Sequence, residues 1–151
     1  LLDVIEHIED DKGFMKELKT SHTIDSATEI LITVPAHQSL FSAHDVFLKH
    51  FRRYTVQSLT ATLEECGYRS RESGYFFLSL LIARYLQKKL NLANREQDQK
   101  GIGDYDPNLV LDPAMYGVLR ADYALSKMAK ALGIKTAGLS CFSICRLQKE
   151  S

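Results

Sequence analysis

Three histidines, His7, His44 and His50, follow segments with the composition of strand ends, and they offer the clearest chemistry in the chain. Histidine has an unperturbed pKa close to neutrality, so each of them could act as a base at physiological pH. Asp45 is next to His44 and close to His50 in sequence, where a carboxylate can orient an imidazole. These four residues are the predicted catalytic candidates. The alternative for His7 is a partly buried side chain that hydrogen-bonds the backbone. For the other three residues, it is a structural network that fixes their loop.

A basic and aromatic cluster, Arg52, Arg53 and Tyr54, follows these histidines, and Tyr75 lies further along the chain in an aromatic run. Guanidinium groups pair well with carboxylates and phosphates, so the cluster could contact an anionic substrate. The alternative is that it anchors its loop to a sheet, and that Tyr75 belongs to the core. We predict these four residues as the substrate-binding candidates.

The elements that must position these residues alternate between strand and helix. Residues 30–34 form a continuous apolar, β-branched run, typical of a strand that is covered on both faces. Thr55 is a favourable helix N-cap, and Gly67 is a favourable stop for that helix. The alternation predicts an α/β fold with a mostly parallel sheet. The expected strands are residues 1–8, 29–34, 68–73 and 137–147, and the expected helices are residues 9–19, 55–67, 75–90 and 112–133.

Length and composition bound the possible functions. The chain has 151 residues, the size of one domain, and 45% of them are hydrophobic. Lys and Arg total 19, as do Asp and Glu, so the net charge of zero gives no electrostatic argument for a nucleic-acid or membrane partner. The polar stretch from residue 91 to 111 is long enough to predict a flexible lid or insertion.

The cysteines and the apolar segments indicate a cytoplasmic protein. Cys141 and Cys145 would lie about 13 Å apart on one strand face, too far for a disulfide, and Cys66 has no evident partner. Reduced thiols are therefore expected. Leu1 opens an apolar, strand-like run rather than a basic segment, so no signal peptide is expected. The run from residue 75 to 83 is too short to span a bilayer.

The ordered set of motifs resembles the second half of a class I S-adenosylmethionine (SAM) methyltransferase of the type 11/12 group. The resemblance rests on Asp-Val-Ile-Glu-His-Ile at residues 3–8, Val-Pro-Ala at 34–36, His-Asp at 44–45, Arg-Arg-Tyr-Thr at 52–55 and Gly-Tyr at 67–68. It is dense up to Gly67 and looser beyond. One departure is visible: the Pro-Gly-Gly-like turn usual before the Val-Pro-Ala strand is replaced by residues 23–26.

The resemblance implies a partial Rossmann-like sheet with family strands in the order 4-5-7-6, the last strand in sequence being antiparallel. The family's glycine-rich SAM loop and ribose-binding acid belong to strands 1 and 2, and neither is present in this sequence. Gly101 and Gly103 are no substitute, because they follow no strand and open no helix. The whole chain would then be a single, incomplete domain that is inactive alone. Its first strand would be an open edge, so self-association through that edge is expected.

The resemblance also implies functional roles. The parent protein would use SAM to methylate a small molecule, with Asp3, Glu6 and His7 lining the cofactor site. Asp3-x-x-Glu6-His7 is similar to the acid-x-x-Glu-His pattern of metal-dependent O-methyltransferases, and His44 or His50 could complete such a ligand set. On a strand, however, residues three apart face opposite ways. We predict no metal as the favoured interpretation, since acidic residues often simply begin a helix.

A function of a different class is also compatible with the sequence. The chain could be a non-catalytic α/β module that acts in assembly, with its open sheet edge as the interaction surface. A glycine-rich loop encoded upstream of Leu1 would favour the enzyme, and a start codon just before Leu1 would favour the module.

Overall fold

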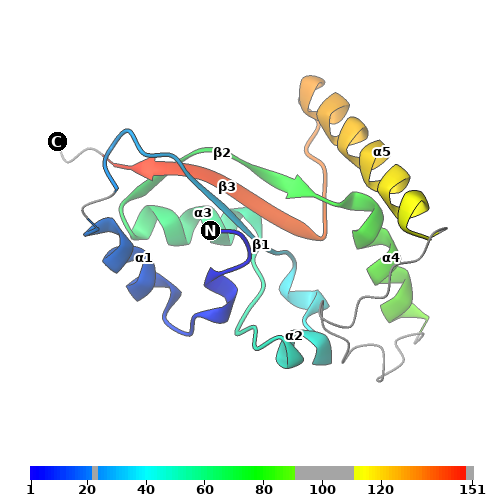
Figure 1. Ribbon diagram of the computed structural model, residues 1–151, viewed down its shortest axis with the longest axis horizontal. Helices are drawn as coiled ribbons and strands as arrows, with labels where there is room; N and C mark the ends of the chain where they lie inside the picture. Colours follow the sequence, from blue (N-terminus) through cyan, green and yellow to red (C-terminus); the bar gives the residue numbers. More distant parts are fainter. Residues whose placement is uncertain (22–23, 91–110, 149–151) are drawn as a thin grey trace.

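The computed structural model describes residues 1–21, 24–90 and 111–148 and has an α/β architecture (Figure 1). The predicted fold class is thereby confirmed at this coarse level. Helices precede and separate the three strands, with short helical turns in two of the loops. In chain order the elements are η1 (Ile5–His7), α1 (Asp11–Lys19), β1 (Ile30–Pro35), η2 (Gln38–Leu40), α2 (Ala43–Phe47), α3 (Val56–Glu65), β2 (Tyr68–Phe76), α4 (Leu78–Lys89), α5 (Leu111–Ala131) and β3 (Ser140–Leu147).

The strands form one open sheet in the order β1-β3-β2, so the last strand in sequence lies in the middle (Figure 1). Both ladders are antiparallel: Ile32 pairs with Ser143 of β3, and Tyr75 of β2 pairs with Cys141. The expectation of a mostly parallel sheet is therefore wrong for the described strands. Parallel pairing among the described residues is confined to two isolated bridges, Leu2 with Thr33 and Ala36 with Tyr54.

The predicted strand over residues 1–8 is much shorter than expected. Two hydrogen bonds of 3.0 Å join this segment to β1. The Asp3 amide donates to the Thr33 carbonyl, and the Thr33 amide donates to the Leu1 carbonyl. Asp3 then has a φ of 51°, and the chain turns into η1 at Ile5. A positive φ in a non-glycine residue ends an extended segment. Glu6 and His7 therefore lie on a helical turn beside the sheet.

One face of the sheet carries the core. Alternate residues of β1 and β3 are buried there, as the two-residue period of a strand requires. Helices α1 and α3 cover this face (Figure 1), contributing Met15, Leu59 and Leu63 to the core. Leu31, on the opposite face of β1, is 44% exposed. The prediction that this strand is covered on both faces is therefore wrong for the described part of the chain.

Strand β2 and helix α4 divide the aromatic run differently from the prediction. Tyr75 and Phe76 extend β2 by pairing with β3, whereas a helix was expected to begin at Tyr75. Phe77 then has a φ of 65°, and α4 starts at Leu78. The β-ladder overrides the helical spacing of the apolar residues. None of the residues of α4 is buried.

Thr55 caps α3 by accepting a hydrogen bond from the Ser58 amide, as predicted. All three cysteines are buried and free, which confirms the absence of disulfides among them. Among the described helices, none combines the length and apolar character needed to cross a membrane. The predicted lid falls almost wholly on residues 91–110, outside the described residues.

Candidate functional site

The candidate site lies in the loop between β1 and α3, where most of the predicted residues are found. The chain leaves β1 through His37, whose φ of 63° redirects it into η2. Helix α2 begins after Ser42, and Asp45 forms a capping box with that residue. Ser and Asp three residues apart are a good sequence signal for such a helix start, because each side chain satisfies the other's free amide. Asp45 thereby acquires a fixed, buried position.

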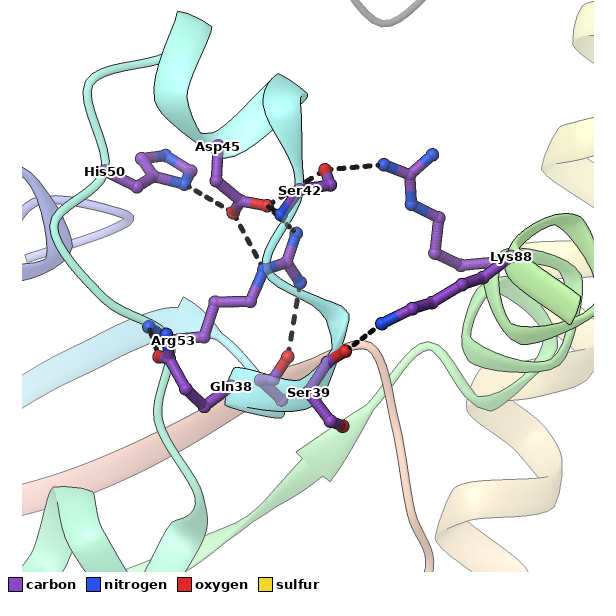
Figure 2. Close-up of polar contacts among 9 residues, drawn as sticks. Gln38, Ser39, Ser42, Asp45, His50, Arg53 and Lys88 are labelled. Atoms are coloured by element: carbon purple, nitrogen blue, oxygen red, sulfur yellow. Dashed lines mark hydrogen bonds and ion pairs between the residues drawn. The ribbon is translucent and has the colours of Figure 1, made fainter. Parts of the chain in front are cut away.

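The carboxylate of Asp45 connects the loop (Figure 2). It accepts hydrogen bonds from His50 Nδ1 at 3.0 Å and from Arg53 Nε and Nη2 at 2.7 and 3.1 Å. The Ser42 amide donates a further bond over 2.9 Å. Burial alone would raise the pKa of Asp45, but the bonds from Arg53 and His50 hold it below its usual range. Asp45 is therefore an ionised, fully buried hub that orients one imidazole and one guanidinium.

Arg53 and Tyr54 use their polar groups in internal contacts. Besides Asp45, the Arg53 guanidinium donates to the Ala36 carbonyl over 3.2 Å. The Tyr54 hydroxyl donates to Asp11, and burial together with that contact raises the tyrosine pKa. Arg52 also pairs with Asp11, at 2.7 Å. This geometry favours the interpretation of Arg52, Arg53 and Tyr54 as loop anchors.

Glu6 and His7 converge with His50, although His50 is more than forty residues away in sequence. One potential ligand atom from each lies within 4.8 Å of the other two. The imidazole rings of His7 and His50 meet edge to face, with 4.6 Å between their centroids. The approach is fixed by the backbone, since the Phe51 amide donates to the Glu6 carbonyl over 2.8 Å. The loop after α2 is thus joined to η1.

Glu6 is the unusual member of this group. Its side chain has an exposed fraction of 0%, and neither carboxylate oxygen has a hydrogen-bond partner. Burial raises the pKa of Glu6 to about 7, and the negative charge of Asp3 adds to the effect. A buried carboxylate without a partner is costly to a fold, which makes it a mark of a functional site.

The other predicted site residues lie outside this group. Asp3 is exposed, and its carboxylate accepts a hydrogen bond from the Thr33 hydroxyl at 3.3 Å. His44 is half-buried on α2. Tyr75 stacks on His37 with 5.3 Å between ring centroids. His37, at the end of β1, was not predicted as a site residue, and its place directly after the Val-Pro-Ala strand was the available signal.

Comparison with known proteins does not assign a family. No protein-family model matches the sequence, and no curated protein matches it. Chemical interpretation therefore rests on the geometry of the chain.

A shallow depression on α1, lined by Phe14 and Leu18 with polar neighbours, contains none of the predicted site residues.

The arrangement supports two kinds of chemistry. His50 has one ring nitrogen held by Asp45, which leaves Nε2 to accept a proton or bind a ligand. Glu6 has two buried oxygens free to accept a hydrogen bond or coordinate a cation. Acid–base work and metal coordination are thus both within reach of the same side chains.

Proposed function

We propose that this chain is the acceptor-side half of a class I SAM-dependent methyltransferase domain that acts on a small molecule. The observation that carries the proposal is the sheet order. β3 lies antiparallel to both of its neighbours, so β1 and β2 run parallel to each other on either side of it. The Leu2–Thr33 bridge adds a parallel neighbour on the other side of β1. This arrangement agrees with the 4-5-7-6 order that the sequence resemblance implies, and so it supports the proposal.

The position of the candidate site also supports the proposal. In open α/β sheets, ligands bind beyond the carboxyl ends of the parallel strands, where the strand order reverses. The loop that begins at His37 follows the carboxyl end of β1, and η1 follows the bridged segment beside it. On this proposal, Asp3, Glu6 and His7 line the donor side of the site, and SAM contacts them together with a glycine-rich half that these 151 residues do not supply.

His50 is the proposed base when the acceptor is a hydroxyl or an amine. Methyl transfer from a sulfonium is an in-line displacement, so the protein has to align the two reactants and remove a proton. The Asp45 carboxylate fixes the His50 ring through Nδ1 and favours the tautomer whose Nε2 is free. Asp45 acts as a positioning residue, and Arg53 holds it in place.

The test compares the 151-residue chain with a version extended by the coding sequence upstream of Leu1. Calorimetry with SAM should show no tight binding to the short chain and clear binding to the extended one. Transfer of a labelled methyl group to a small-molecule extract should then follow. In the extended protein, His50→Ala should lower the rate, whereas Gln57→Ala on the exposed side of α3 should not. Failure of the extended protein to bind SAM would refute the proposal.

A non-catalytic assembly module remains the second candidate, because the edge beside β1 is open in the described chain. Leu2 is 63% exposed on the segment that pairs with Thr33. An apolar edge of this kind can pair with a second copy. Self-association measured by light scattering, together with no SAM binding by the extended protein, would favour the module. A monomer would count against it.

A further inference from the structure

Glu6, His7 and His50 form a set of side chains with the composition and spacing of a metal site. Their potential ligand atoms lie within 4.8 Å of one another. In a tetrahedral zinc site, with bonds of about 2.1 Å, ligand atoms are roughly 3.4 Å apart. Side-chain rotations that shorten the separations by up to about 1.4 Å would therefore enclose an ion. His7 is exposed, so one side of the group is open to solvent.

The burial of Glu6 points to a missing positive partner. Asp45 and Arg53 neutralise each other inside the loop, and Arg52 similarly pairs with Asp11. The Glu6 carboxylate has no ion pair or hydrogen bond among the described residues, although the side chain is fully buried. Buried charges in proteins are normally paired or coordinate metals. A bound cation would supply the interaction that Glu6 lacks.

His50 has the outer contacts that are typical of a metal-binding histidine. Such a histidine usually donates its second ring N–H to a carboxylate, which fixes both the tautomer and the ring orientation. Asp45 accepts this bond from His50 Nδ1 at 3.0 Å. Asp45 is itself fixed by Arg53 and by the Ser42 amide. The free nitrogen is therefore held ready for a ligand.

We propose that Glu6, His7 and His50 bind one divalent transition-metal ion, with Zn²⁺ as the best fit. Two imidazoles and one carboxylate suit zinc, and three protein ligands leave a fourth position open, as in catalytic zinc sites. Mg²⁺ and Ca²⁺ prefer oxygen ligands and fit this set less well. Asp3 also belongs to the acid-x-x-Glu-His pattern, but it lies outside the group. The chain turns at Asp3, and the Asp3 carboxylate accepts a hydrogen bond from the Thr33 hydroxyl instead.

Metal binding at this group does not depend on methyl transfer, since only the three side chains are needed to hold the ion. An ion would occupy the His50 nitrogen that the proposed base uses, so the two roles exclude each other at any moment. Methyl-transfer assays of the extended protein in chelator and in Zn²⁺ would separate them. Zinc binding without methyl transfer would support the metal site and refute the proposed methyltransferase. Methyl transfer without zinc binding would support the methyltransferase and refute the metal site.

The direct test is zinc binding by the full 151-residue chain, by calorimetry and by metal analysis after dialysis. One Zn²⁺ per chain is expected. His7→Ala and Glu6→Gln should each weaken binding by roughly 100-fold or more, because even the loss of an outer contact typically costs 10–100-fold. Glu64→Gln, at an exposed position on α3, is the matched control and should bind like the unchanged chain.

Two further measurements keep the test decisive. Far-UV circular dichroism in chelator should show that His7→Ala remains folded, because the His7 side chain is exposed. Cobalt substitution should give visible bands of nitrogen and oxygen ligation. Thiolate-to-cobalt bands would instead place the ion at a cysteine and overturn the proposal. Equal zinc affinity in His7→Ala and the unchanged chain, or no zinc retained by the unchanged chain, would also overturn it.

Discussion

Replacing Glu6 by glutamine should change how the stability of the metal-free chain depends on pH. Burial raises the pKa of Glu6 to about 7 from a usual value near 4.5. Between these two values the folded chain keeps the proton that the unfolded chain releases. Stability therefore falls as the pH rises from about 4.5 to about 7, and the loss is then constant. Glutamine cannot ionise, so Glu6→Gln removes this part of the pH dependence.

The size of the effect follows from the shift. Each unit of pKa difference corresponds to about 1.4 kcal/mol, so the full loss is about 3.5 kcal/mol in the free energy of unfolding. The imidazoles of His7 and His50 face Glu6, and Asp3 is a nearby negative charge. These groups are present in both the unchanged chain and Glu6→Gln. The difference in stability between the two proteins therefore removes the part of their effect on the pH dependence that does not involve Glu6. The unfavourable burial of a neutral amide in the variant is independent of pH.

Urea unfolding followed by circular dichroism from pH 5 to pH 8, in chelator, measures this difference. The variant should gain stability relative to the unchanged chain by up to about 3 kcal/mol across the range, or about 2–4 °C in Tm per kcal/mol. Addition of Zn²⁺ at pH 8 should stabilise the unchanged chain and leave the variant nearly unaffected. Parallel stability curves for the two proteins in chelator would refute the reasoning about Glu6.

Two further substitutions test the packing around the site. Gly138→Ala should destabilise the chain by about 1–3 kcal/mol or more in the same urea assay, because a Cβ there would lie 2.0 Å from the Phe76 carbonyl oxygen. Gly117→Ala is the control, because no atom lies within 4 Å of the new Cβ. This control should stabilise α5 by about 0.5–1 kcal/mol. Asp45→Asn should cost about 3–5 kcal/mol because it leaves the Arg53 guanidinium buried without a counterion. Adding Arg53→Met to that variant should recover part of the loss, and a purely additive double variant would contradict the ion-pair argument.

Much of the local structure could be predicted because its causes lie within a few residues. The apolar run of β1, the Thr55 cap and the glycine after α3 each act over one or two turns of chain. Errors arose where pairing with a distant strand decided the outcome. Tyr75 and Phe76 have spacing that suits a helix, but β3 pairs with them and holds them in β2. Sequence reasoning could not weigh that ladder against the local preference.

The candidate site shows the same division. The residue types in the loop indicate acid–base chemistry, and Asp45 and His50 are close enough in sequence for their contact to be anticipated. The anchoring role of Arg53 was an open alternative, and only the buried bidentate contact with Asp45 favours it. A local pattern can indicate which chemistry a loop could support. It does not show which polar side chains form internal contacts that hold the loop in place.

By itself, the sequence determined the α/β class, the free cysteines and the cluster of histidines with a neighbouring carboxylate. These features depend on composition and short-range spacing. The tertiary structure alone decided that Glu6 is buried without a partner and that His7 and His50 meet beside it. The physical reason is the turn at Asp3, which ends the first strand early, and the bond from the Phe51 amide to the Glu6 carbonyl. Together they join two segments more than forty residues apart, a proximity that no local pattern encodes.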